Sequence, residues 1–235
     1  LAVDNHEYTN ENIMFPPTTD PSTLDEQKRI AMAAHGLTVV ELRRSAPGRP
    51  WTYVRDSGYN RRITAQTPFA VSGPAAGHPL LRTKDDPVGR VILGTQNNCA
   101  GGTTPWGTVL SGEENFNQYF VAAATPENAR YGIPATASGR AWWTVDPRFD
   151  ARQAGYENEV NRFGWIVELD PEDPTSTPVK HTSLGRFKHE GATIRVARDG
   201  RVVAYSGDDE RFEYVYKFVS KKRMRHDATR AARAH

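Results

Sequence analysis

The sequence NNCAGGTTPWGTVLSGEEN, from Asn97 to Asn115, holds the only cysteine of the chain, Cys99, and two adjacent carboxylates, Glu113 and Glu114. A Gly-Gly pair and a Thr-Pro-Trp-Gly turn lie between two short runs, which predicts a β-hairpin. A thiol and two carboxylates near one turn are suitable ligands for a metal ion. Taken alone, however, the stretch is better explained by a hairpin with a small buried cysteine and solvated glutamates than by a metal site.

The composition fits a globular protein with many turns. The 235 residues include 19 glycines and 16 prolines, and 37% are hydrophobic. The net charge of +2 is too small to indicate nucleic acid as a specific partner, and the basic excess lies largely near the C-terminus, in residues 217–233. No apolar stretch reaches the ~20 residues of a membrane-spanning helix, so we expect no membrane span. A single cysteine excludes an intrachain disulfide.

Both ends of the sequence suggest a piece of a longer protein. Leu1 opens a strand-like run with nothing before it, and no signal peptide is visible. The polar segment 220–235 is helix-prone but has nothing to pack on. We therefore expect the chain to be the N-terminal part of a larger protein.

One helix and about ten short strands are predicted. Thr23 and Glu26 have the spacing of a capping box, which predicts a helix over residues 24–35 that ends at Gly36. Apolar and polar residues alternate over 212–219, with Phe212 and every second residue after it on one face. Strands are expected near residues 1–8, 37–43, 51–55, 90–95, 108–110, 118–122, 163–170, 179–187, 193–197, 202–206 and 212–219. The segments 57–87 and 126–155 are predicted to be long loops, with the aromatic residues of the second packed beneath it.

Short strands separated by Gly/Pro turns indicate a mainly β fold, either a sandwich, a barrel or a propeller. Groups of four strands that end near Ala122 and Val219 favour the blades of a propeller. The sequence itself has no clear repeat.

Acidic residues recur at the predicted strand ends, among glycines. In a propeller, equivalent strand ends converge on one mouth, so carboxylates distant in sequence can share a cation. Carboxylate oxygens suit calcium, magnesium or ferric iron, whereas a thiolate suits a softer transition metal, so a mixed cluster fits better than a single zinc ion. The candidate ligands are Glu7, Cys99, Glu113, Glu114, Glu190, Asp208 and Asp209.

Two observations limit this hypothesis. Neighbouring residues of a strand face opposite sides, so Glu113 and Glu114 can both bind the same cluster only if Gly112 ends the strand. The sequence also has no CxxC or HExxH zinc motif, no Gly-rich nucleotide loop before a helix and no G-x-S-x-G elbow.

Several ordered motifs resemble the PhoX alkaline phosphatase family, over nearly the whole chain from residue 5 to about 219. The motifs are Asn5-His6-Glu7-Tyr8, Asn98-Cys99-Ala100-Gly101-Gly102, Thr104-Pro105-Trp106-Gly107-Thr108, Glu113-Glu114-Asn115, Arg162-Phe163-Gly164-Trp165, Gly185-Arg186-Phe187-Lys188-His189-Glu190 and Gly207-Asp208-Asp209.

The resemblance implies a six-bladed β-propeller that is exported to the periplasm or secreted and hydrolyses phosphate monoesters at a cluster of ferric iron and calcium. Cys99 and Glu190 would then be iron-side ligands. Glu7, Glu114 and Asp209 would be calcium or bridging ligands, with Glu113 and Asp208 as further candidates. A metal-bound oxygen would attack phosphorus, so no side chain of this chain needs to be the nucleophile.

Family members are about twice this length or more. The resemblance therefore implies that residues 1–235 form a partial propeller whose later blades, further carboxylate ligands and phosphate-contacting arginine are missing. We expect the piece alone to be inactive and, with unpaired edge strands, poorly soluble, and the full-length protein to be a monomer. Two other functions stay open: a non-catalytic calcium-binding propeller scaffold and a calcium-dependent propeller lactonase.

Overall fold

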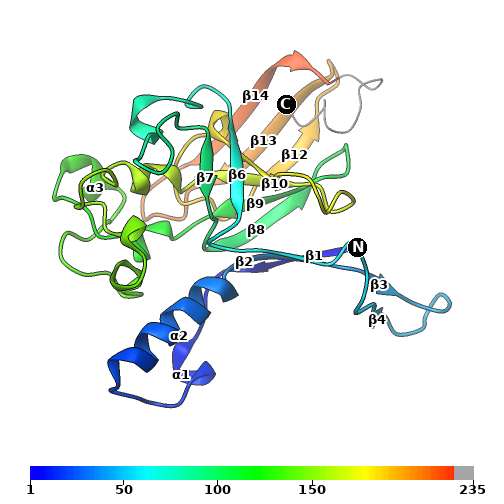
Figure 1. Ribbon diagram of the computed structural model, residues 1–235. Coiled ribbons are helices and arrows are strands. Elements are labelled where there is room, and N and C mark those ends of the chain that lie inside the picture. The colour runs from blue at the N-terminus through cyan, green and yellow to red at the C-terminus, as the bar shows by residue number, and fades with distance from the viewer. Residues whose placement is uncertain (225–235) are drawn as a thin grey trace.

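The computed structural model describes residues 1–224 and shows a mainly β fold with few helices (Figure 1). The strands are β1 (Ala2–His6), β2 (Gly36–Val40), β3 (Leu42–Arg43), β4 (Thr52–Tyr53), β5 (Arg61–Ile63), β6 (Pro68–Ser72), β7 (Val91–Leu93), β8 (Asn98–Thr103), β9 (Val109–Glu113), β10 (Ile166–Leu169), β11 (Val179–His181), β12 (Thr193–Val196), β13 (Arg201–Gly207) and β14 (Val215–Arg223). The α-helices are α1 (Glu11–Met14), α2 (Pro21–Ala34) and α3 (Pro126–Arg130). The 3-10 helices are η1 (Pro79–Leu81), η2 (Phe116–Gln118), η3 (Trp142–Thr144), η4 (Pro147–Phe149), η5 (Glu159–Arg162) and η6 (Thr182–Leu184).

A six-stranded sheet with the order β7-β6-β11-β10-β9-β8 forms the centre of the molecule. Its β6–β11 pair is parallel and its other pairs are antiparallel. Two three-stranded sheets, β1-β2-β5 and β12-β13-β14, flank it, and β3 and β4 form a small projecting hairpin (Figure 1). The consecutive strands β8 to β11 form an antiparallel meander like that of a propeller blade, but β6 and β7 extend the sheet beyond four strands. The propeller itself stays a prediction.

The predicted hairpin around Cys99 is confirmed. β8 and β9 are antiparallel, with Thr103 opposite Val109 and a register shift between Asn98 and Gly101. At Gly101 the two strands approach so closely that a Cβ atom would lie 1.7 Å from the carbonyl oxygen of Leu110. A glycine is therefore required at this position.

The helix prediction was wrong at its start. α2 begins at Pro21 and is capped by Asp20, whose Oδ2 accepts a hydrogen bond of 2.9 Å from the Thr23 amide, so no capping box from Thr23 to Glu26 is used. Proline suits the first helical position because its missing N–H would have no partner there.

Other predictions also differ from the structure. The segment 57–87, predicted to be a long loop, contains β5 and β6, and the predicted strand 179–187 ends at His181, where η6 follows. Residues 118–122 contain the end of η2 and one isolated bridge, between Val121 and Asp150. β14 begins only at Val215 because Phe212 has a φ of +68° and its side chain is 97% exposed, which places it in a turn. Residues 220–223 continue β14 and Met224 follows it without helical structure, so this part of the predicted C-terminal helix is wrong; residues 225–235 lie outside the described residues.

The largest core includes Trp142 and Phe149, so aromatic residues of segment 126–155 pack beneath it, as the sequence predicted. Its aromatic side chains pack in tilted and edge-to-face pairs, such as Tyr119 and Trp142 with ring centroids 4.4 Å apart. The buried aromatic residues of this core are Phe116, Tyr119, Phe120, Trp142, Phe149, Phe163 and Trp165. A second core joins the β1-β2-β5 sheet to the central sheet through Leu37, Ile63, Phe69 and Val167.

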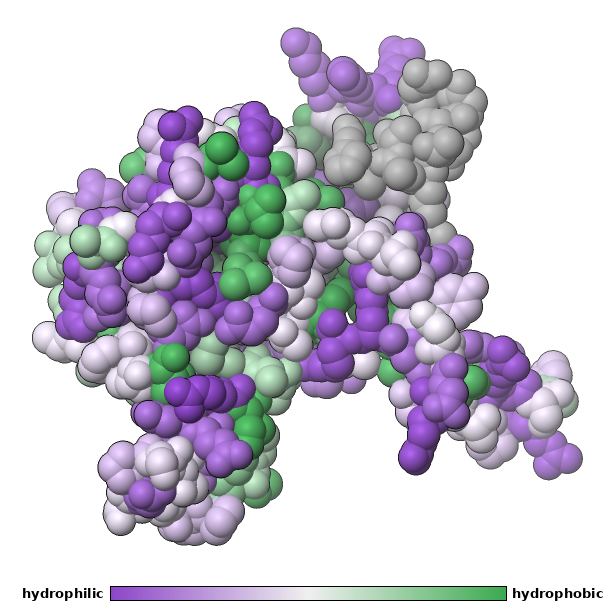
Figure 2. Space-filling model, viewed as in Figure 1, coloured by the Kyte–Doolittle hydropathy of each residue, from purple (hydrophilic) through white to green (hydrophobic). Residues whose placement is uncertain are grey.

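α1 and α2 form an arm that projects from the body (Figure 1). Apolar groups are visible along one side of this arm in Figure 2, and Ile13 and Ile30 are among the exposed large hydrophobic residues. Among the described residues, no helix combines the length and the hydropathy that crossing a membrane requires.

Candidate metal centre

Three potential metal ligands converge where β1, β8 and β9 meet. Glu7 directly follows β1, Cys99 is the second residue of β8, and Glu114 directly follows β9. One ligand atom from each of these side chains lies within 4.8 Å of the other two. Residues from opposite ends of a long stretch of chain therefore form one group, as the sequence pattern had suggested.

The electrostatics of this group are those of crowded acidic side chains. Burial raises the pKa of Cys99 to about 12, and the neighbouring Glu114, Glu7 and Glu190 add to the effect. Burial and a hydrogen bond with Asp209 raise the pKa of Glu114 to about 7. Both shifts have the cause expected where low solvation and like charges disfavour ionisation.

Asp209 and Glu190 lie at the edge of the same group. The carboxyl of Asp209 hydrogen-bonds that of Glu114, and the Asp209 amide donates to the Lys188 carbonyl over 3.1 Å. The carbonyl of Glu190 accepts a hydrogen bond of 2.7 Å from the Ala100 amide, which ties the segment of Glu190 to that of Cys99. Both side chains are exposed, so the group is open to solvent on this side.

No basic side chain in residues 1–224 forms an ion pair with Glu7, Glu114, Glu190 or Asp209. Two buried or half-buried lysines near these segments have other partners: Lys188 pairs with Glu210, and Lys180 pairs with Glu113. An acidic group without a balancing side chain fits a bound cation, because a cation removes the like-charge repulsion. The donor set of one thiol and several carboxylates fits a cluster with both a softer and a harder metal ion.

The structure does not bring Glu113 to this group. Its Oε1 accepts from Lys180 Nζ at 2.6 Å and from Thr95 Oγ1 at 2.9 Å, and its Oε2 accepts from the amides of Gly164 and Trp165. Glu113 and Lys180 are both fully buried. With both carboxylate oxygens occupied in this way, Glu113 holds β9 to the core.

Asp208 is also separate from the group. It forms an isolated bridge with His189, and its Oδ1 accepts a hydrogen bond of 3.2 Å from the Glu210 amide, which is the geometry of a turn. Burial raises its pKa. The sequence pattern could not distinguish Asp208 from Asp209 because the two are adjacent in the same turn.

Asn115 contributes to the candidate metal centre, although the sequence pattern did not single it out. Its Nδ2 donates a hydrogen bond of 2.7 Å to Glu114 Oε1, which orients this carboxylate. An asparagine directly after two glutamates at a strand end is the only signal of this role in the sequence.

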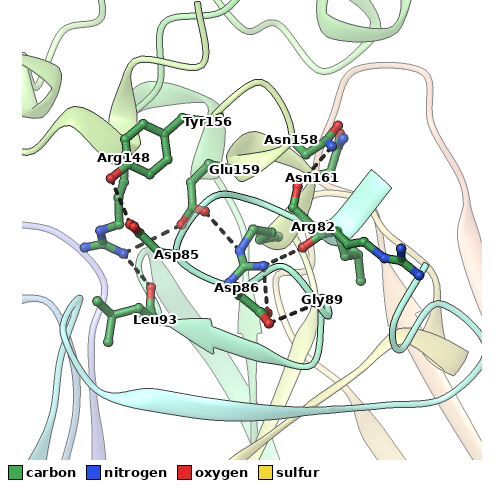
Figure 3. A network of polar contacts seen from close by, with 12 residues as sticks. Arg82, Asp85, Asp86, Gly89, Leu93, Arg148, Tyr156, Asn158, Glu159 and Asn161 are labelled. Atoms are coloured by element: carbon green, nitrogen blue, oxygen red, sulfur yellow. Dashed lines mark hydrogen bonds and ion pairs between the residues drawn. The ribbon is translucent and has the colours of Figure 1, made fainter. Parts of the chain in front are cut away.

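A second polar network lies outside the metal centre, around the buried Glu159 (Figure 3). Glu159 pairs with Arg162 at 3.0 Å and lies 3.7 Å from Arg148, which also donates to the Leu93 carbonyl. Arg162 in turn pairs with Asp86 at 3.1 Å. These arginines bridge loops to the central sheet, so Arg162 has a structural role.

Similarity to known proteins extends over the whole described chain. The family model described as alkaline phosphatase PhoX matches residues 1–234. A solved structure, Pseudomonas fluorescens PhoX in complex with vanadate, a transition state analogue, is similar with 46% sequence identity and a TM-score of 0.89. The similarity covers 99% of this chain and 40% of that chain, so this chain spans about two fifths of the length of that protein. No curated protein sequence matches.

Proposed function

Because the chain belongs to the alkaline phosphatase PhoX family, we propose that it forms part of an enzyme that hydrolyses phosphate monoesters. The observation that carries the proposal is the convergence of Glu7, Cys99 and Glu114 within 4.8 Å. The vanadate complex of the relative supports it further, because vanadate resembles the phosphoryl group in transfer.

The proposed cofactors are ferric iron and calcium. Cys99 and Glu190 would hold the iron, and Glu7, Glu114 and Asp209 would hold calcium or bridge the metals. When bound, these cations would neutralise the phosphoryl oxygens and so favour in-line displacement of the alcohol. Glu113 and Asp208 are left out of this ligand set because of their other contacts.

The residues of this chain would prepare the site in three ways. Glu114 is 4% exposed, and the Asn115 amide group holds its Oε1, so its orientation is set before a cation binds. Glu7, directly after β1, supplies a second carboxylate from a segment that follows a different sheet. Cys99 has to lose its Sγ proton to bind a metal, so metal binding releases a proton and is favoured as the pH rises.

Hydrolysis of p-nitrophenyl phosphate by the complete natural protein tests the proposal, together with elemental analysis of its metal content. Asp209→Asn should weaken metal binding, and so lower the metal content, and it should also lower activity. The expected loss in affinity or in activity is roughly 10- to 100-fold. Asp208→Asn is the matched control and should leave both near the wild-type values, since Asp208 lies in the same turn outside the group. A metal-free protein with full activity would contradict the proposal.

Cys99→Ala distinguishes the phosphatase from the other functions considered. A calcium-binding scaffold or a calcium-dependent lactonase gains little from a thiolate, since calcium prefers oxygen ligands. We expect the variant to lose iron and phosphatase activity while its fold persists. Unchanged phosphatase activity would count against the proposed iron ligand. The location outside the cytoplasm and the monomeric state of the whole protein remain predictions.

A further inference from the structure

Asn97 has an unusual backbone and a fully buried side chain. Its φ is +51°, in the left-handed region, and its exposed fraction is 0%. Asparagine tolerates this region better than most other residues with a side chain. Asn97 lies two positions before Cys99, directly before the start of β8.

The polar groups of Asn97 bind the segments that carry two other candidate ligands. Its carbonyl accepts a hydrogen bond of 3.0 Å from the Glu114 amide, and its Oδ1 accepts one of 2.6 Å from the Asn115 amide. Its Nδ2 donates to the carbonyl of Glu7 at 3.4 Å. Asn97 therefore connects Glu7, Glu114 and, through the chain itself, Cys99.

A buried hydrogen-bond chain anchors this residue to the core. Asn97 Nδ2 also donates to Tyr119 Oη at 3.1 Å, and Tyr119 Oη lies 2.9 Å from His35 Nε2. His35 Nδ1 lies 2.7 Å from the Ala31 carbonyl, which can only accept, so Nδ1 carries the proton and Nε2 accepts from the Tyr119 hydroxyl. All three side chains are fully buried. The direction of every hydrogen bond from α2 to Asn97 is thus determined.

We propose that Asn97 is the positioning residue of the metal centre and that Tyr119 and His35 hold it in place. The proposal rests on the proposed function, since the cation that Glu7, Cys99 and Glu114 would bind is the one named there. The carbonyl oxygen, Oδ1 and Nδ2 of Asn97 all have hydrogen-bond partners other than the side chains of the candidate ligands. Each is used on a neighbouring segment, so the residue acts through Glu7, Cys99 and Glu114.

Two substitutions separate the side chain from the backbone conformation. Asn97→Gly keeps the positive φ at no steric cost and removes every side-chain hydrogen bond. Asn97→Asp keeps the acceptor for the Asn115 amide but replaces the donor that Glu7 and Tyr119 use. Tyr119→Phe is the third variant, which removes only the hydroxyl between Asn97 and His35.

Asn60 provides the matched control. It also joins loop segments through its side chain, accepting from the Glu41 amide at 2.8 Å and donating to the Val54 and Arg55 carbonyls. It lies between β4 and β5, and these hydrogen bonds hold segments other than the three that carry the candidate ligands. Asn60→Gly should therefore lower stability without changing metal binding.

The experiment titrates Ca²⁺ into the complete, chelator-treated protein by isothermal titration calorimetry, far below the melting temperature of each variant. Asn97→Gly should weaken Ca²⁺ binding by roughly 10- to 100-fold, as is typical when a residue that orients metal ligands is removed. Asn97→Asp and Tyr119→Phe should weaken it less. Asn60→Gly should match the wild type in affinity, whatever its melting temperature.

Wild-type Ca²⁺ affinity in Asn97→Gly, or an equal loss in Asn60→Gly, would overturn the proposal. If Asn97→Gly does not fold, Tyr119→Phe decides in the same way, with wild-type affinity as the overturning result. Phosphatase activity of the wild type is measured separately. A wild type that binds Ca²⁺ without hydrolysing p-nitrophenyl phosphate would refute the proposed function alone.

Discussion

Glu113 and Glu114 are neighbours in the chain, but their carboxylates have different environments. The carboxylate of Glu113 lies 2.6 Å from Lys180 Nζ in the fully buried core, whereas that of Glu114 lies with Cys99 and Glu7. β9 does not end at Gly112 but continues to Glu113, so the alternation of the strand still applies there and the two side chains point apart. One glutamate therefore stabilises the sheet, and the next is available to a cation.

Removal of Glu113 should destabilise the fold strongly. Glu113→Ala leaves the buried Lys180 without its partner, and loss of one member of a buried ion pair costs about 3–5 kcal/mol in the free energy of unfolding. Glu210→Ala is the control, because Glu210 is 39% exposed where it pairs with Lys188, and such pairs contribute about 0–1 kcal/mol. Urea denaturation of the complete protein measures the free energy of unfolding of both variants. An equal loss of stability in the two would contradict the assignment of Glu113 to the core.

Neutralising Glu114 should stabilise the metal-free protein while weakening its response to metal. In the metal-free state, the pKa of Glu114 is raised to about 7, so ionisation is unfavourable in the fold and stability falls as the pH rises from 4.5 through 7. Glu114→Gln removes this charge, and its melting temperature without metal at a pH of about 8 should exceed that of the wild type. Added Ca²⁺ should raise the wild-type melting temperature more. Calorimetric scans with chelator and with Ca²⁺ test this, and a lower metal-free melting temperature for Glu114→Gln would refute it.

Gly101→Ala should disrupt the hairpin that carries Cys99. The added Cβ atom would lie 1.7 Å from the Leu110 carbonyl oxygen, so β8 and β9 would have to separate. We expect a large loss of stability, of more than about 2 kcal/mol, together with loss of metal binding. Gly139→Ala is the control, since a Cβ atom added there would have nothing within 4 Å. Similar thermal unfolding of the two variants would contradict the close approach of the strands.

The buried His35 should make the protein sensitive to acid. Burial lowers its pKa from 6.5 to about 4, so between these values the unfolded chain binds a proton that the folded chain does not. The contribution of His35 to the free energy of unfolding is therefore fully present above pH 6.5 and is lost as the pH drops toward 4. The whole shift corresponds to roughly 3 kcal/mol. His35→Gln should lower stability at neutral pH and flatten the slope in this window. Denaturant midpoints of the wild type and of His35→Gln at a pH of about 7 and about 4.5 give the comparison, and an equal fall of the midpoint in both proteins would contradict the assignment to His35.

Much of the site could be anticipated because its residues lie at strand ends. Glu7 is marked by its position after the short apolar run at the start of the chain, and Cys99 and Glu114 by their positions close to glycines, which a single sequence displays. The distinction between Asp208 and Asp209 could not be anticipated, since it depends on the turn before β14. The alternation of Phe212 with later aromatic residues has the β period and predicts a strand, but its positive φ puts it in a turn.

The sequence by itself determined the mainly β class, the hairpin around Cys99 and the set of acidic residues from which a metal site could be built, because these depend on local patterns of apolar, turn and charged residues. Only the tertiary structure decided which carboxylates meet. Glu113 forms a buried ion pair with Lys180, 67 positions later in the chain, and this pair keeps it out of the group of candidate ligands. Asn97 joins the segments of Glu7 and Glu114 through its hydrogen bonds. Such pairings are set by packing between distant segments, which no local pattern encodes.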